Sequence, residues 1–260
     1  MELVLIGLTA LLAAGLTLFS GFGLGTILMP AFALFVPVPV AIAATAVVHF
    51  LNNLFKLGLL AKKADWRVAA LFGLPAMLAS VVGARLLGLF ARVPPLASYR
   101  MGGATFGITV LNLTIGILVV CFALLELWPR FRRLAFSARW LPTGGLLSGF
   151  FGGLSGNQGA LRAAFLVKAG LSKESFVATG VVVAIAVDAS RLSVYGTQLF
   201  REPLSFLRGM AEPVAIAVVC AFTGSFVGRR MLGKVTIRAV RLAVVAAMLL
   251  IGTGLAMGVV

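Results

Sequence analysis

The chain has 260 residues, of which 61% are apolar and only 11% are charged. A soluble domain could not cover so much apolar surface with polar atoms, so lipid is the expected solvent. The net charge of +15 would suggest a nucleic-acid partner in a soluble protein. Here the basic residues lie mostly in short connections between apolar runs, where they orient a chain in the bilayer. We therefore predict a multi-pass protein of the cell inner (plasma) membrane, with no nucleic-acid partner.

The first apolar stretch, 3–36, is interrupted by the glycine-rich run 20–25. Glycine at this density breaks a helix, and irregular backbone at membrane depth is tolerated only beside protein or a water-filled cavity. Glu2 stands where a secretory peptide would carry a basic residue, so we expect this stretch to be retained.

About 20 apolar residues are needed to span a bilayer. Six uninterrupted stretches meet this requirement, at 40–60, 68–90, 101–127, 176–199, 209–231 and 239–257. A second interrupted stretch, 142–169, contains the glycine-rich run 152–159. The sequence thus predicts six full spans and two broken hairpins, with room for a seventh span in 3–36.

The two halves of the chain share sequence features in the same order. Ser-Val-Val-Gly-Ala-Arg at 80–85 recurs as Ser-Phe-Val-Gly-Arg-Arg at 225–230, and Ala-Thr-Ala-Val-Val at 44–48 recurs as Ala-Thr-Gly-Val-Val at 178–182. Each half also begins with its glycine-rich break. An internal duplication explains this order. We assign 1–127 to the first membrane repeat, 128–141 to a basic linker and 142–260 to the second repeat.

The cationic residues of the connections predict the orientation of the repeats. If 142–169 crossed the membrane once, these cations would divide nine against nine; if it returns to the side from which it entered, they divide fourteen against four. The positive-inside rule favours the second arrangement. The predicted fold is therefore an all-α polytopic membrane protein with two inverted-topology repeats and glycine-rich broken or re-entrant helices. The basic loops 61–67, 128–141 and 229–241 are predicted to be cytoplasmic.

Transporters with inverted repeats bind substrate near the midplane, where broken helices bring their ends together. The exposed N–H groups and positive dipole of a helix start favour an anion. We predict contacts to a small anion from Gly23, Gly25 and Thr26 in the first break and from Asn157, Gln158 and Arg162 in the second.

Polar residues inside two predicted spans share one helical face each: Thr45, His49, Asn52, Asn53 and Lys56 in 40–60, and Ala184, Asp188, Arg191 and Tyr195 in 176–199. Charged groups this far inside a span usually face a cavity or a partner. We predict that Lys56 and Arg191 supply positive potential and that Asn52 and Asn53 orient the anion. His49 and Asp188 are the candidates for proton coupling.

A structural interpretation stays open for each charged residue. Lys56 lies four residues from the end of its span, so its side chain can also extend to the membrane interface. Arg191 can simply neutralise Asp188 one turn away. His49, the sole histidine, fits an interhelical hydrogen bond as well as proton coupling.

We predict no metal, no cofactor and no catalytic residue. Cys121 and Cys220 lie alone inside apolar runs without metal-ligand spacing. An enzyme alternative comes from Gly-Leu-Ser-Gly at 153–156, which matches the short nucleophile motif of rhomboid intramembrane proteases with His49 as the base. In rhomboids, however, the histidine follows the serine, and the duplication has no place in that fold. A passive anion channel is the other alternative.

The sequence resembles the TauE/SafE family of sulfite and organosulfonate exporters over nearly its whole length. The resemblance rests on Ser-Gly-Phe-Gly-Leu-Gly-Thr-Ile-Leu-Met-Pro at 20–30, the run 44–48, the paired Ser-x-x-Gly-x-Arg motifs and the run 148–165. Leu24 interrupts the family's usual consecutive glycines, and the second copy has Arg162 near the position of its proline. The resemblance implies a duplicated transporter of sulfite or another sulfur-containing anion. Alternating access would come from rocking one repeat against the other.

Overall fold

The computed structural model describes residues 1–20, 24–128, 130, 135–199, 204–231 and 237–259, and these form ten α-helices and one β-hairpin. In the first half, the elements are α1 (Glu2–Ser20), α2 (Leu24–Ala33), α3 (Val38–Leu60), a 3-10 turn (Ala61–Lys63), α4 (Trp66–Phe90), β1 (Ala97–Met101), β2 (Ala104–Ile108) and α5 (Val110–Leu127). In the second half, they are a 3-10 turn (Ala138–Trp140), α7 (Leu141–Ser155), α8 (Gly159–Leu166), α9 (Lys173–Leu199), α10 (Leu204–Met231) and α11 (Ile237–Ala256).

The helices confirm a polytopic membrane protein. Within the described residues, five segments are long and apolar enough to cross a membrane: Val38–Gly58, Trp66–Phe90, Val110–Leu127, Lys173–Thr197 and Gly209–Gly228. They correspond to five of the six predicted spans. The sixth corresponds to α11, of which Val245–Ala256 is the part that qualifies as a shorter apolar helix. Both glycine-rich runs interrupt helices, between α1 and α2 and between α7 and α8.

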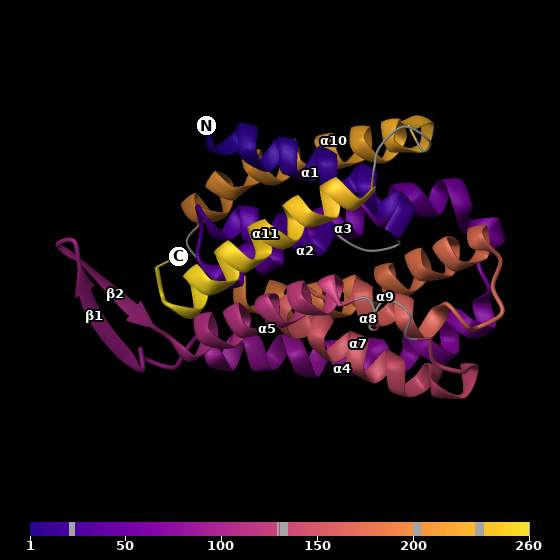
Figure 1. Cartoon of the computed structure of the whole chain (residues 1–260), viewed down its shortest axis with the longest axis horizontal. Helices are drawn as coiled ribbons and strands as arrows, with labels where there is room; N and C mark the ends of the chain where they lie inside the picture. The colour runs from indigo at the N-terminus through magenta and orange to yellow at the C-terminus, as the bar shows by residue number, and fades with distance from the viewer. Residues whose placement is uncertain (21–23, 129, 131–134, 200–203, 232–236, 260) are drawn as a thin grey trace.

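A β-hairpin precedes α5, so the predicted span 101–127 was wrong at its start. Gly102 and Gly103 have φ values of 59° and 83°. A two-residue turn of this kind matches the twist of antiparallel strands, and only glycine adopts it without steric cost. Thr109 then caps α5 by accepting a hydrogen bond from the Asn112 N–H at 3.0 Å. The hairpin projects from one end of the helical bundle (Figure 1).

The segment containing α7 and α8 folds back on itself. A side chain at Gly144, near the start of α7, would collide with the ring of Phe165, near the end of α8. The Phe136 N–H, just before α7, donates to the Ala164 carbonyl at 3.3 Å. With eight residues, α8 is about 12 Å long and too short to cross a bilayer. The chain therefore leaves this segment at the end of the bundle where it entered.

Contacts at the two ends of the bundle give the directions of α3 and α9. The start of α3, the end of α4 and the start of α5 line one cavity of about 260 Å³. At the opposite end, the Asp65 N–H before α4 donates to the hydroxyl of Thr179 near the start of α9 at 2.9 Å. Since α4 joins these two ends, α3 and α9 run in opposite directions.

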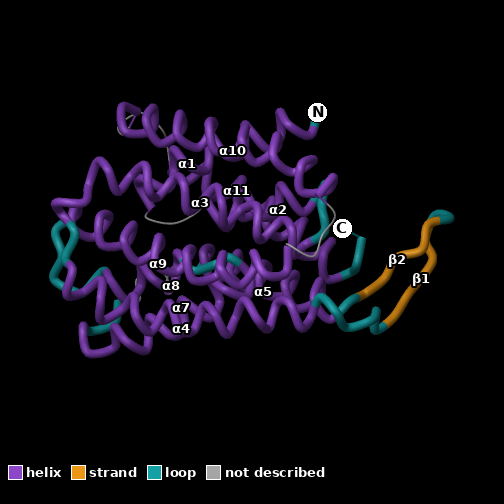
Figure 2. The backbone as a smooth tube through the Cα atoms, turned by 180° about the vertical axis from the view of Figure 1, so that it is seen from behind, coloured by secondary structure: helices purple, strands orange, loops and turns teal. Residues whose placement is uncertain are grey.

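The helices form two layers, one with α1, α2, α3, α10 and α11 and the other with α4, α5, α7, α8 and α9 (Figures 1 and 2). Within the layers, glycines allow close helix crossings. A Cβ atom at Gly149 of α7 would collide with the Ala76 carbonyl of α4, and one at Gly224 of α10 with the Leu11 carbonyl of α1. Small residues at such crossings let helices pack closely where lipid removes the hydrophobic driving force.

Candidate functional site

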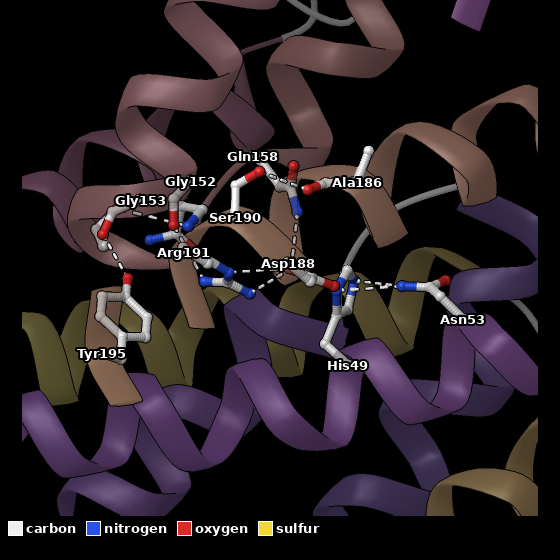
Figure 3. A network of polar contacts seen from close by, with 12 residues as sticks. His49, Asn53, Gly152, Gly153, Gln158, Ala186, Asp188, Ser190, Arg191 and Tyr195 are labelled. Carbon is white, nitrogen blue, oxygen red and sulfur yellow. Dashed lines mark hydrogen bonds and ion pairs between the residues drawn. The ribbon is translucent and has the colours of Figure 1, made fainter. Parts of the chain in front are cut away.

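Asp188, in the middle of α9, is the centre of a buried polar network (Figure 3). Its Oδ2 lies 2.6 Å from Nδ1 of His49 on α3, and its Oδ1 lies 2.9 Å from Nε and 2.8 Å from Nη2 of Arg191. Gln158, at the start of α8, donates from Nε2 to the same Oδ1 at 3.3 Å. A buried carboxylate is tolerated only when it is paired and hydrogen-bonded in this way.

Arg191 and Tyr195 hold the end of α7 beside this network. Arg191 donates from Nη1 to the Gly152 carbonyl at 3.0 Å, and the Tyr195 hydroxyl donates to the Gly153 carbonyl (Figure 3). The last carbonyls of a helix carry its negative end, which a cation stabilises. Gly156 then ends α7 with φ of 80°. Arg191 therefore both neutralises Asp188 and positions the second break.

The polar face predicted for α3 is turned into the protein. Thr45, Asn52, Asn53 and Lys56 are buried, and the side chain of His49 is 13% exposed. The amide nitrogen of Asn53 lies 3.1 Å from Nδ1 and 3.4 Å from Nε2 of His49. The pairing of His49 with Asp188 thus joins the polar faces of two helices that pack against each other.

Lys56 is held inside the bundle by a second polar cluster. The hydrogen-bond network assigns the orientation of the Asn52 amide: its nitrogen donates to the Ser225 hydroxyl at 2.8 Å and to the Ala221 carbonyl at 3.3 Å, and its oxygen accepts from Nζ of Lys56 at 3.2 Å. Lys56 is only 5% exposed. Its ammonium group therefore points to Asn52 instead of extending to the end of the span.

The two glycine-rich breaks meet inside the bundle. A Cβ atom at Gly25, in the first turn of α2, would lie 3.1 Å from the carbonyl oxygen of Gly156, between α7 and α8. Gly25 and the neighbouring Thr26 are both buried. Gly23, predicted for the same site, lies outside the described residues. A larger residue at position 25 would require the opposing backbone at Gly156 to shift by a few tenths of an ångström.

Several buried polar atoms at this meeting point have no hydrogen-bond partner among the described residues. These are both amide atoms of Asn157 and the Oε1 atom of Gln158. The hydroxyl of Thr45 on α3 is also buried without a hydrogen-bond partner in the described part of the chain. Asn157 is 4% exposed. Burying such a group unpaired costs about 1–3 kcal/mol, so native interiors rarely contain it without a reason.

Positive charge exceeds negative charge around the breaks. Arg162 of α8 is 6% exposed and lies against Gly180 of α9, where an added Cβ atom would be 3.6 Å from its Nε. It interacts electrostatically with both Lys56 and Asp188. Lys56, Arg162 and Arg191 are thus three buried cations, whereas the buried carboxylates of the described chain are Asp188 and Glu126, the latter on α5.

The hydrogen bonds of Ser155 do not fit the protease alternative. Its hydroxyl donates to the Phe151 carbonyl at 3.0 Å and lies 3.4 Å from the Asn157 N–H, whereas His49 pairs with Asp188. Among the residues with described positions, no cluster of three or more His, Cys, Asp or Glu could hold a metal ion.

Three partners in the site were not predicted from the sequence. Ser225, which bonds to Asn52, belongs to the repeated Ser-x-x-Gly-x-Arg motif, so the repeat itself contained the signal. The other two acceptors, the carbonyls of Gly152 and Gly153, belong to the main chain, so no side-chain pattern in the sequence predicts them. They accept hydrogen bonds because the end of α7 lies next to α9.

Comparison with known protein families identifies a match over most of the chain. The sequence model of the family described as "Sulfite exporter TauE/SafE" matches residues 6–255. No curated protein and no solved structure has a significant similarity to the chain.

Proposed function

Because the chain belongs to the sulfite exporter TauE/SafE family, we propose that it transports sulfite or a related sulfur-containing anion across the membrane by alternating access. Family members are transporters and not enzymes. The anion would bind where the two glycine-rich breaks meet.

The observation that best supports this anion site is the buried side-chain amide of Asn157, which has no hydrogen-bond partner among the described residues and lies in a region of excess positive charge. An oxyanion presents several acceptor oxygens, so it would accept from the Asn157 amide while Lys56 and Arg162 balance its charge. The close approach of Gly25 to Gly156 brings main-chain groups of both breaks to the same place. Arg191 contributes positive potential but acts mainly by holding Asp188 and the end of α7.

The opposite directions of α3 and α9 support an inverted arrangement of the two repeats. The return of α8 toward the start of α7 supports it too, because the second repeat then begins its spans at the end of the bundle where the first finishes. Two inverted copies would present their breaks to one shared midplane site.

We include proton coupling in the proposal. The bond between His49 and Asp188 joins the sole histidine to a fully buried carboxylate next to the anion site. Protonation at this pair would change the local charge by one unit beside Arg162 and Arg191. This change in charge would alter the binding of an anion that moves with the proton or against it.

The test is flux into proteoliposomes, preceded by a binding screen of purified protein against sulfite, thiosulfate, sulfoacetate, taurine and sulfate. We expect Lys56→Met to abolish flux of the anion that binds, without preventing membrane insertion. Lys63→Met, at an exposed lysine, is the matched control and should transport normally. Normal flux in Lys56→Met would reject this site.

The same assay tests coupling. Flux through the unmodified protein should follow an imposed pH gradient, and His49→Gln should still transport but lose that response. A passive channel predicts flux that ignores the gradient in both proteins.

A further inference from the structure

The two layers of the structure do not coincide with the two halves of the sequence. Unit A, defined as residues 2–60 with 204–256, contains α1, α2, α3, α10 and α11; unit B, defined as residues 66–199, contains α4, α5, α7, α8 and α9 (Figures 1 and 2). The chain passes between the units only at 61–65 and at 200–203, the second of which lies outside the described residues. Unit B is therefore a continuous insertion between the two parts of unit A.

Within each unit, the closest helix crossing joins a helix from the first half of the sequence to one from the second half. In unit A, α1 crosses α10 so closely that a Cβ atom at Gly15 would lie 3.2 Å from the Gly224 carbonyl oxygen. In unit B, the glycines of α7 lie directly on the backbone of α4, as at Gly149 and Ala76. Gly83 and Gly228, which match in the repeated motif, each make such a contact with the first helix of the other half.

Most side-chain hydrogen bonds between helices also stay within a unit. Asn52 of α3 bonds to Ser225 of α10 inside unit A. Arg191 and Tyr195 of α9 bond to the end of α7 inside unit B. These bonds lock helices from different halves into one body.

The boundary between the units is formed mainly by two helix pairs, α3 with α9 and α5 with α11. The pair of α5 and α11 is a backbone-to-backbone crossing, where a Cβ atom at Gly116 would collide with the Gly252 carbonyl and the Ala256 backbone. The pair of α3 and α9 carries the bond between His49 and Asp188. The facing glycines of the two breaks also lie on opposite sides of this boundary, in α2 and after α7.

We propose that units A and B are the rigid bodies that move against each other during transport, pivoting where α5 crosses α11. The anion site and the His49–Asp188 bond lie on the moving boundary, so one motion opens the site and breaks the bond. This differs from rocking one half of the sequence against the other, because α1 moves with α10 and α7 moves with α4. The packing carries the proposal, whereas its flux readout and the pH dependence of the motion rest on the proposed function.

Two cross-linking experiments distinguish movement of units A and B from movement of the two halves of the sequence. A Cβ atom at Gly7 of α1 would lie 3.2 Å from Sγ of the native Cys220 of α10, so Gly7→Cys in a Cys121→Ala background should form a disulfide inside unit A. This disulfide joins the two halves. We expect full flux with it oxidised, whereas rocking of the halves predicts a loss that reduction reverses.

The second cross-link joins the units within one half. Val36, before α3, and Val93, after α4, line the same cavity on opposite sides of the boundary. In a cysteine-free background, Val36→Cys with Val93→Cys bridged by a short bis-maleimide should lose flux, and each single variant with the same reagent should keep it. Normal flux after bridging, or lost flux in the oxidised Gly7→Cys protein, would overturn the proposal.

The motion can also be measured without a substrate, so it can be tested even if the anion proposed above is wrong. Exposed positions accept spin labels in nanodiscs: Leu8 on α1, Val219 on α10 and Leu78 on α4. Between pH 5 and pH 8, about the range over which histidine changes charge, the Leu8–Leu78 distance should shift and the Leu8–Val219 distance should not. A shift of Leu8–Val219 contradicts moving units whether or not sulfite is the substrate, and no shift in either pair contradicts the proposal that the motion breaks the His49–Asp188 bond.

Discussion

Asn157 places a complete carboxamide inside the bundle with neither of its polar atoms hydrogen-bonded to the described protein. Its neighbours are well paired: Gln158 donates to Asp188, and the Ser148 hydroxyl donates to the Gln158 carbonyl at 2.9 Å. Gln158 leaves only its Oε1 atom without a partner, whereas both side-chain polar atoms of Asn157 lack one among the described residues. Under the proposed function, this amide would donate to the bound anion.

Replacing Asn157 with alanine should separate binding from stability. No hydrogen bond to described protein groups is lost, so we expect the thermal unfolding temperature to stay the same or rise. Anion affinity should fall by about 10- to 150-fold, which corresponds to about 1.5–3 kcal/mol for one lost hydrogen bond to a charged ligand. Calorimetric titration and flux against concentration would measure the change.

Ser148→Ala is the control for that prediction. It removes a hydrogen bond that the protein makes to itself, so it should lower the unfolding temperature. If Asn157→Ala instead destabilised the protein and left anion affinity unchanged, the amide would be structural and the proposed site would lose its main support.

At the scale of the elements, the contact of α7 with α4 is made by glycines spaced one turn apart. A Cβ atom added at any of three positions of α7 would collide with a backbone carbonyl of α4: Gly145, Gly149 and Gly153. Such a contact cannot relax by a side-chain rotation, because main chain opposes main chain. The two helices must separate to accept any larger residue.

Gly149→Ala should therefore strongly destabilise the protein, by about 1–3 kcal/mol or more, the usual cost of overpacking. Gly58→Ala is the matched control, since Gly58 also lies in a helix but has no atom within 4 Å of an added Cβ. There the loss of glycine's backbone freedom should stabilise by about 0.5–1 kcal/mol. Thermal unfolding in detergent would compare the two. Equal stabilities would mean that α7 does not lie on α4 as described.

The sequence predicted individual elements better than their partners. Both breaks followed from glycine density, and the inward face of α3 followed from helical periodicity, because both signals are local. The hairpin before α5 was missed because Gly102 and Gly103 were absorbed into an apolar run, although a Gly-Gly pair is a hairpin signal. The pairing of His49 with Asp188, 139 residues apart, depends on helix packing that no local pattern encodes.

At the scale of the whole molecule, charge and geometry place the same basic residues at one end of the bundle by independent routes. The loops predicted to be cytoplasmic contain Lys62, and Lys168 follows α8, which returns to the end where α7 began. The bond between Asp65 and Thr179 places the starts of α4 and α9 together at that end. The hairpin with Arg100 lies at the other end of α4, a helix of 25 residues, or about 38 Å.

Cysteine labelling with a membrane-impermeant maleimide would test this orientation. In a background lacking Cys121 and Cys220, we expect Lys62→Cys and Lys168→Cys to react in inside-out vesicles and Arg100→Cys to react in intact cells. All three positions are exposed, so failure to react reports sidedness and not burial. The positive-inside rule fixes the cytoplasmic side, whereas the fold-back of α8 fixes only that Lys62 and Lys168 share a side. Labelling those two from opposite sides would therefore contradict the fold itself, and labelling all three from the reversed sides would contradict only the charge argument.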